Sequence, residues 1–170
     1  GGGPLLFLGS IATHKGPGLV VQAWRTHIQG RGPELRLHGP IIEAGICDGH
    51  PVGAALDRSQ IWETLSQATA LVMGSTWAEN APLVILEARA ARCPVVAPRI
   101  GGIPELIEEG RDGILYEPGD VDDLGRQRPR RAVVGSEPAV ADHLDDREHR
   151  VHQRAADEHL QHFDLARHPH

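Results

Sequence analysis

Short apolar runs alternate with amphipathic stretches along the first 125 residues. Mostly apolar runs that are bounded by glycine, proline or polar residues are typical of strands buried on both faces of a sheet. The chain has such runs at residues 5–8, 35–39, 70–73, 94–97 and 114–116. We predict that each of these runs is a strand.

Between these runs, apolar residues recur at helical spacing. The pattern predicts helices at residues 20–28, 57–68, 80–91 and 103–109. Asp57 and Asn80 are the expected caps of the second and third helices, and Gly30 and Gly110 are the expected stop signals of the first and fourth. Residues 40–56 contain several glycines and prolines, and their pattern predicts no element.

Apolar strands that alternate with helices predict an α/β fold. Parallel strands are joined by helices, which cover both faces of the sheet. We therefore expect a Rossmann-like, doubly wound parallel sheet with helices on both faces. Ligands of such sheets bind at the carboxyl ends of the strands, so candidate sites lie in the segments that follow the apolar runs.

The composition changes near residue 126. Residues 1–125 hold nine basic and 15 acidic residues and carry the whole net charge of −6, whereas residues 126–170 hold eight of each. The second part has seven of the 11 histidines and only eight Ile, Leu, Val or Phe residues, which are too few for a core. We expect one domain at 1–125 and an Arg/His-rich tail at 126–170 that is disordered or weakly helical. A frameshift near codon 126 is a hypothesis for the origin of this tail, and a chain that begins without methionine suggests a fragment.

The charge and the cysteines argue against several classes of function. A net charge of −6 disfavours a protein that binds the backbone of a nucleic acid. No apolar run is long enough to cross a membrane. Cys47 and Cys93 lie at no metal or redox spacing, so they indicate free thiols in the reducing cytoplasm, with a disulfide between them as the alternative. We expect no metal site.

The first candidate site lies between the first predicted strand and the first predicted helix. It contains Gly9, Ser10 and Lys15, which is the only lysine of the chain, followed by Pro17 in the first turn of the helix. Amides at a helix start bind anions, and a lysine beside them adds positive charge. Spacing alone leaves two interpretations open: an anion site, and the more common solvated lysine beside a turn.

The second candidate site surrounds the start of the third predicted helix. Glu79 precedes this helix and Glu87 lies inside it, with seven residues between them. Pro82 lacks an amide hydrogen and suits the first turn, where the free amides around Ala81 and Leu83 can hold a phosphate. Two carboxylates at this spacing can each accept hydrogen bonds from hydroxyl groups of one extended ligand. The alternative is a favourable charge at the helix start and a solvated Glu87.

A pair of glycines, Gly101 and Gly102, forms the third candidate site, after the strand predicted at 94–97. Paired glycines allow the backbone to come close to a ligand. The signal is weak by itself, because such pairs are also common where a chain enters a helix.

Together these motifs resemble the carboxyl-terminal half of retaining GT-B glycosyltransferases of the GT4 family (glycosyl transferases group 1). The resemblance extends from about Leu5 to Leu124, and several motifs in one order are far more specific than any one of them. The motifs are, in order, Gly-Ser-x4-Lys-Gly, a Glu-x7-Glu pair within Glu-Asn-x-Pro-Leu-Val-Ile-x-Glu-Ala, Pro-Val-Val-Ala, Gly-Gly-Ile-Pro-Glu-Leu-Ile and Gly-Ile-Leu-Tyr-x-Pro-Gly-Asp.

The resemblance implies one half of a GT-B fold that binds a UDP-, GDP- or ADP-sugar donor without a metal. It implies that Lys15 contacts the donor diphosphate, that Glu79 contacts the transferred sugar and that Glu87 holds the ribose hydroxyls. Many family members have arginine in the place of Ser10, so Lys15 is the one cation evident here. The residues assigned to donor binding are Gly9, Ser10, Lys15, Asn80, Ala81, Pro82, Leu83, Glu87, Gly101 and Gly102, with Glu79 and Lys15 as the catalytic residues.

The resemblance also implies a partner for this domain. A GT-B enzyme has an amino-terminal acceptor domain, and its active site lies between the two halves. We therefore expect the isolated chain to bind a donor without sustained sugar transfer, and to meet a membrane surface only through the other half. The alternative is a truncated, non-catalytic module that binds nucleotide sugars. A flavodoxin-like regulator is disfavoured, because no acidic cluster follows the first strand.

Overall fold

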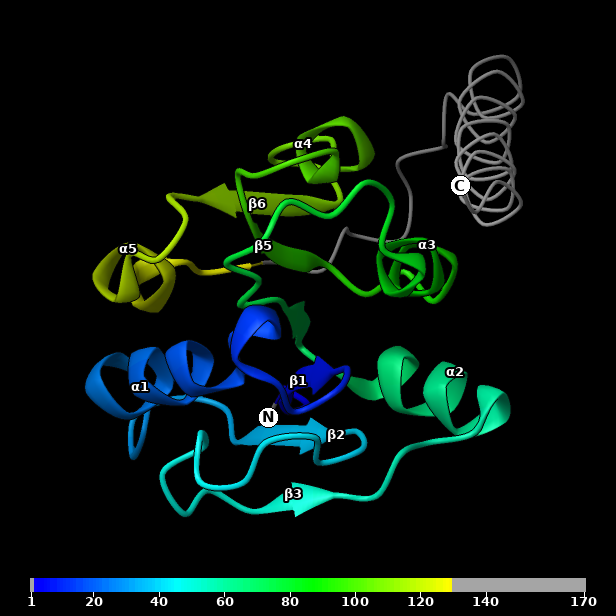
Figure 1. Ribbon diagram of the computed structural model, residues 1–170. Coiled ribbons are helices and arrows are strands. Elements are labelled where there is room, and N and C mark those ends of the chain that lie inside the picture. Colours follow the sequence, from blue (N-terminus) through cyan, green and yellow to red (C-terminus); the bar gives the residue numbers. More distant parts are fainter. Residues whose placement is uncertain (1, 130–170) are drawn as a thin grey trace, which may run out of the picture. The chain divides into compact units, whose positions relative to one another are not determined.

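Six parallel strands form one sheet in the computed structural model, which describes residues 2–129 (Figure 1). Each strand pairs in parallel with its neighbours, in the order β3-β2-β1-β4-β5-β6. The strands are β1 (Leu5–Leu8), β2 (Leu35–His38), β3 (Val52–Gly53), β4 (Ala70–Val72), β5 (Val95–Pro98) and β6 (Gly113–Tyr116). This confirms the predicted parallel sheet and the five predicted strands.

Helices cover both faces of this sheet. Figure 1 shows α1 and α5 together on one face, and α2 and α3 on the other. The helices are α1 (Pro17–His27), α2 (Arg58–Gln67), α3 (Leu83–Ala90), α4 (Ile103–Leu106) and α5 (Val121–Arg126), with a 3₁₀ turn, η1 (Thr13–Lys15), before α1. The Rossmann-like, doubly wound fold is therefore confirmed.

The burial of the strands explains why they were visible in the sequence. All residues of β4 and β5 are buried, because these strands lie inside the sheet and have helices on both faces. In β2, Leu35 and Leu37 are buried whereas Arg36 between them is exposed. The sequences of the central strands are therefore continuous apolar runs. In β2, which lies nearer the edge, buried apolar residues alternate with exposed or partly exposed polar ones.

Several elements differ from the prediction, among them α5, which the sequence pattern did not predict, and α1, which begins at Pro17 instead of residue 20. Residues 40–56 contain the two-residue strand β3, which pairs with the end of β2. The third helix begins at Leu83, so Asn80 is not its cap and Pro82 lies just before the first turn. A proline disfavours helical backbone in the residue before it, Ala81, and Pro82 itself has an extended ψ of 117°, so the helix begins at Leu83. Helix α4 ends at Leu106 instead of continuing to residue 109, because the backbone becomes extended at Ile107.

The cap of α2 is as predicted. The Asp57 carboxylate accepts a hydrogen bond from the amide of Gln60, and the Gln60 side chain accepts one from the amide of Asp57. This reciprocal pair is a capping box, and it satisfies two amides at the start of the helix.

The order of the strands reverses beside β1. The chain moves outward from β1 to β2 and β3, then returns to the other side of β1 to form β4. The segments that follow β1 and β4 therefore leave the carboxyl edge at the point of reversal, where doubly wound sheets bind their ligands.

Predictions for the tail lie outside the described residues, which end at Pro129. Helix α5 includes residue 126, where the composition changes. None of the helices within residues 2–129 is both long and apolar enough to cross a membrane.

Candidate functional site

Three segments meet at the carboxyl edge of the sheet, one each after β1, β4 and β5. The amide of Thr76, after β4, donates a hydrogen bond of 3.0 Å to the carbonyl of His14, after β1. The amide of Gly102, after β5, donates one of 2.8 Å to the carbonyl of Glu79. The segment after β4 is thus held from both sides by backbone hydrogen bonds.

Close contact between two glycines brings the first and second segments together. A Cβ atom on Gly16 would lie 1.8 Å from the carbonyl oxygen of Gly74, and one on Gly74 would lie 2.1 Å from the oxygen of Gly16. Gly16 also has a positive φ of 64° and caps the start of α1. Any larger residue would push the two segments apart, so the glycines allow Lys15 and the residues after Gly74 to meet.

An ion pair joins the two catalytic candidates. Lys15 Nζ lies 3.0 Å from Glu79 Oε2. The other carboxylate oxygen, Oε1, accepts a hydrogen bond of 2.5 Å from the hydroxyl of Ser75. The structure therefore brings together Lys15 and Glu79, which lie 64 positions apart in the chain, and adds a third group that the sequence motifs did not single out.

Ser75 was missed because a lone serine carries no pattern. It follows a buried strand at the edge where ligands bind, and that position is the one signal the sequence offers. Apart from Tyr116, it is the one buried residue within residues 2–129 that has a side-chain oxygen or nitrogen. Buried hydroxyl groups nearly always have a hydrogen-bond partner, and here the partner is a candidate catalytic carboxylate.

Gly101 and Gly102 pack against the segment that carries Glu79. A Cβ atom on Gly101 would lie 2.6 Å from the carbonyl oxygen of Glu79, and one on Gly102 would lie 2.0 Å from that of Asn80. The structure thus gives these glycines a contact inside the protein, which fixes the position of Glu79. Their predicted contact with a ligand remains a prediction.

The remaining donor-binding candidates line the same edge. Gly9 and Ser10 follow β1, and the amide of Gly9 donates a hydrogen bond of 3.1 Å to the carbonyl of His38 at the end of β2. Asn80, Ala81, Pro82 and Leu83 lead into α3, whose first amides lack acceptors within the helix. Glu87 is half-buried inside α3 and lies outside the contact between Lys15 and Glu79.

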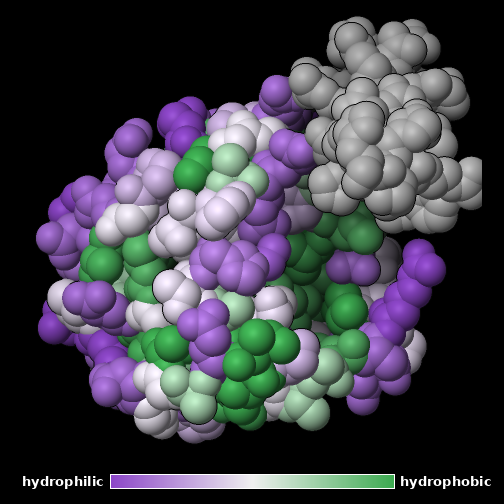
Figure 2. Space-filling model, in the orientation of Figure 1, coloured by the Kyte–Doolittle hydropathy of each residue, from purple (hydrophilic) through white to green (hydrophobic). Residues whose placement is uncertain are grey.

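Exposed apolar side chains also lie near this edge. Ile41 and Ile42, just after β2, are 60% and 66% exposed. Figure 2 shows a patch of apolar surface over the segment between β2 and β3, and further apolar areas elsewhere on the same face. Trp77 and Leu83, which flank Glu79 and Asn80 in the sequence, are exposed as well.

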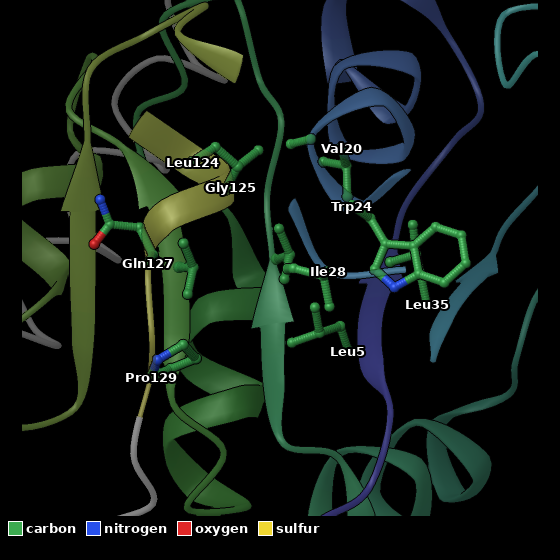
Figure 3. A pocket seen from close by; sticks show the side chains of 12 residues that line it. Leu5, Val20, Trp24, Ile28, Leu35, Leu124, Gly125, Gln127 and Pro129 are labelled. Carbon is green, nitrogen blue, oxygen red and sulfur yellow. The ribbon is translucent and has the colours of Figure 1, made fainter. Parts of the chain in front are cut away.

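A separate crevice opens between α1 and α5 and encloses about 340 Å³, including space open to solvent (Figure 3). Leu5, Leu35, Val72 and Val96 of the sheet line it, and neither Lys15 nor Glu79 does. Its walls are almost wholly apolar and contain no ionisable side chain. It has no group that recognises a phosphate, and we do not assign the site to it.

Within residues 2–129, no cluster of three or more His, Cys, Asp or Glu residues could hold a metal ion. Cys47 and Cys93 are both buried and no disulfide joins them, so the prediction of thiols is confirmed and the alternative of a disulfide between them is wrong. Burial raises the pKa of the Cys47 thiol above its usual value.

Comparison with known proteins points to one family. Residues 4–127 match the model of the family described as glycosyl transferases group 1. A sulfoquinovosyl transferase of Arabidopsis thaliana is 42% identical over an alignment of 87 residues, and the match covers 43% of this chain and 17% of the relative. A D-inositol 3-phosphate glycosyltransferase of Corynebacterium urealyticum is 32% identical over an alignment of 135 residues, and the match covers 65% of this chain and 30% of the relative. The chain thus spans less than a third of the length of either relative.

The fold is shared with solved structures. Anabaena HepE, crystallised with UDP and also with UDP-glucose, superposes with a TM-score of 0.61 in its UDP complex, at 22% identity. The match covers 71% of this chain and 36% of HepE.

Proposed function

Since the chain belongs to the glycosyl transferases group 1 family, we propose that it is the donor-binding part of a retaining, GT4-type glycosyltransferase. It would bind a nucleoside-diphosphate sugar, whose sugar is transferred to an acceptor hydroxyl. The observation that carries this proposal is the ion pair of Lys15 and Glu79, which lies where the strand order reverses. A cation and a carboxylate at that edge suit the two chemical parts of such a donor, a diphosphate and a polyhydroxyl sugar.

The names of the relatives support this class of substrate. One relative is a sulfoquinovosyl transferase and another is a D-inositol 3-phosphate glycosyltransferase. HepE was solved with UDP and with UDP-glucose. We propose UDP, GDP or ADP as the nucleotide of the donor. The sugar and the acceptor remain open.

In this proposal, Lys15 contacts the diphosphate of the donor. When the bond between the sugar and the diphosphate breaks, negative charge develops on the leaving phosphate oxygen. A fixed cation stabilises that charge. The domain carries more acidic than basic residues, so a local positive group must hold the anionic donor against the average field.

Glu79 and the start of α3 bind the rest of the donor. The Glu79 carboxylate accepts hydrogen bonds from the transferred sugar, and the amides around Ala81 and Leu83 bind the phosphates. Glu87, the fifth residue of α3, holds the ribose hydroxyls. Gly9 and Ser10 complete the segment after β1 that faces the diphosphate.

The acceptor site belongs, in this proposal, to an amino-terminal domain of the GT-B fold. The alternative is a module that binds nucleotide sugars without transferring them. Sustained sugar transfer by this chain alone would contradict that alternative. Two buried cysteines that form no disulfide support a reducing, cytoplasmic location.

The proposal is tested by titrating the chain with UDP, GDP and ADP by calorimetry. We expect Lys15→Ala to weaken binding of the best nucleotide about tenfold or more, because a hydrogen bond to a charged group contributes about 1.5–3 kcal/mol. The matched control is Arg111→Ala. Arg111 pairs with Glu108 before β6, at the other end of the strands, and its loss should change the affinity less than about twofold.

Two results would contradict the proposal. One is the absence of binding of all three nucleotides at millimolar concentration. The other is equal loss of affinity in the two variants, because this would show that Lys15 acts only through the net charge of the protein.

A further inference from the structure

The two oxygens of the Glu79 carboxylate have different partners. Oε1 accepts the hydrogen bond of the Ser75 hydroxyl at 2.5 Å, and Oε2 lies 3.0 Å from Lys15 Nζ. The partners do not share an oxygen, so one of them can leave while the other stays.

The two partners of Glu79 also differ in how much of each is exposed to solvent. Ser75 is 2% exposed, the Glu79 side chain 16% and the Lys15 side chain 32%. A ligand that arrives from solvent therefore reaches Lys15 and Oε2 before it reaches Ser75. Of the three groups, the Ser75 hydroxyl is the most buried and the Lys15 ammonium group is the most exposed to solvent.

The backbone that carries Ser75 and Glu79 is fixed on both sides. Gly74, before Ser75, is in contact with Gly16, and the carbonyl of Glu79 accepts the hydrogen bond of the Gly102 amide. The side chain of Glu79 still has several rotatable bonds, and a fixed backbone does not orient its carboxylate. A second contact on the carboxylate itself is needed for that, and Ser75 supplies one from a buried position.

We propose that Ser75 is a positioning residue for Glu79. Its hydroxyl holds Oε1 in place, so that Oε2 can exchange the Lys15 ammonium group for a hydroxyl of the donor sugar. Lys15 is released to the diphosphate in the same event. This inference rests on the proposed function for its ligand, but the arrangement of the three side chains is a property of the chain without ligand and can be tested there.

The test uses the fact that Lys15 is the only lysine in the 170 residues. A chain labelled with ¹⁵N at lysine side chains gives one ammonium signal in NMR, and its position reports whether the ammonium group meets a carboxylate. Glu79→Gln supplies the signal of Lys15 without a charged partner. The variants compared with it are Ser75→Ala, Ser75→Thr and the control Ser59→Ala. The Ser59 hydroxyl also donates a hydrogen bond to a carboxylate, that of Asp57 at the cap of α2, so the control removes the same kind of contact at a different carboxylate.

Without nucleotide, we expect Ser75→Ala to move the lysine signal at least about halfway toward its position in Glu79→Gln, because the carboxylate loses its anchor. Ser75→Thr keeps a hydroxyl and should restore the wild-type signal, and Ser59→Ala should not change it. If Ser75→Ala does not fold, Ser75→Cys, which keeps the volume but donates only weakly, takes its place. Two results would overturn the inference. In one, the lysine signal of Ser75→Ala stays at its wild-type position. In the other, the wild-type protein gives the same signal as Glu79→Gln.

A second measurement separates this inference from the proposed function. UDP and UDP-glucose are the probes. We expect Ser75→Ala to leave the affinity for UDP within about twofold and to weaken that for UDP-glucose about fivefold or more, since only the sugar meets Glu79. Equal losses for the two probes would overturn the positioning role. No binding of UDP, GDP or ADP by the wild-type chain would contradict the proposed function alone, because the lysine signal does not depend on nucleotide.

Discussion

A single phenol group fixes the end of the strand that leads into the site. Tyr116 is the only tyrosine of the chain, and it is buried at the end of β6. Its hydroxyl donates a hydrogen bond of 2.8 Å to the carbonyl of Met73, one residue after β4 and two before Ser75. Burial raises the pKa of this phenol well above its usual value of about 10. Tyr116 thus stays neutral in the folded protein at pH values where an unfolded chain would lose its proton.

This pKa makes stability fall at alkaline pH. The contribution of the neutral phenol is fully present below about pH 10 and is lost as the pH rises toward the higher pKa of the folded state. We expect the free energy of unfolding in urea to fall by about 1.4 kcal/mol more in the wild type than in Tyr116→Phe between about pH 8 and about pH 11.

Near neutral pH, Tyr116→Phe should cost about 1 kcal/mol, the typical value of one hydrogen bond. Absorbance of tyrosinate near pH 11 in the folded wild type, as strong as that in urea, would contradict the assigned environment.

Individual site residues were predicted to different extents. Lys15 and Glu79 stood out because a lone lysine after an apolar strand and a glutamate before a helix are visible in a linear pattern. Their contact was not visible, because it depends on two segments that meet only when β4 returns beside β1. Ser75 was not predicted, because its importance comes from burial and from one hydrogen bond, and neither leaves a trace in spacing.

At the scale of elements, the contact between the segments after β1 and β4 depends on a glycine. Gly16 has a φ of 64° and lies against the Gly74 carbonyl, whereas Gly30, which ends the first helical region, has a φ of 76° and no atom near its missing Cβ. The two positions share the backbone conformation that L-residues rarely adopt, and they differ in the space around them.

Alanine at each position separates these two effects. Gly30→Ala should lower the free energy of unfolding by about 1 kcal/mol through its backbone conformation alone. Gly16→Ala should cost at least about 2 kcal/mol more, because the new methyl group overlaps the backbone of Gly74. It should also move the Lys15 ammonium signal, whereas Gly30→Ala should not. Equal stability of the two variants in urea titrations would show that the contact is absent in solution.

The elements themselves were predicted best where burial is greatest. The runs that became β1, β4 and β5 are apolar on both faces, so the sequence alone marks them as strands. The strand β3 was missed, because two half-buried residues that pair only with the end of β2 form no run. The start of α3 was placed too early, because the asparagine at residue 80 is a good cap by type while Pro82 sets the true boundary.

At the scale of the whole molecule, stability should differ between the edge and the centre of the sheet. Cys47 lies in the connection between β2 and the short edge strand β3, and Cys93 lies just before β5, which has a strand on each side. Both thiols are buried. Local openings require less free energy where few strand pairs must break, so the edge should open more often than the centre.

These two residues are the only cysteines of the chain and can report on the two regions separately. We expect a thiol reagent such as DTNB to modify Cys47 about tenfold or more faster than Cys93 in buffer, with the single variants Cys47→Ser and Cys93→Ser identifying each phase. In urea above the unfolding midpoint, the two rates should converge. Equal, slow modification of both thiols in buffer would show instead that residues 2–129 open as one unit.

The central place of β1 also affects how the chain is made. β1 pairs with β2 from Leu35 and with β4 from Ala70, so this strand emerges from the ribosome before either of its neighbours. At about 5–20 residues per second, the ribosome needs several seconds to reach β4 after it completes β1. During that time an apolar strand with unpaired edges is open to aggregation. For a nascent chain of this protein, the interval between the syntheses of β1 and β4 is therefore the period when binding by a chaperone would have its greatest effect.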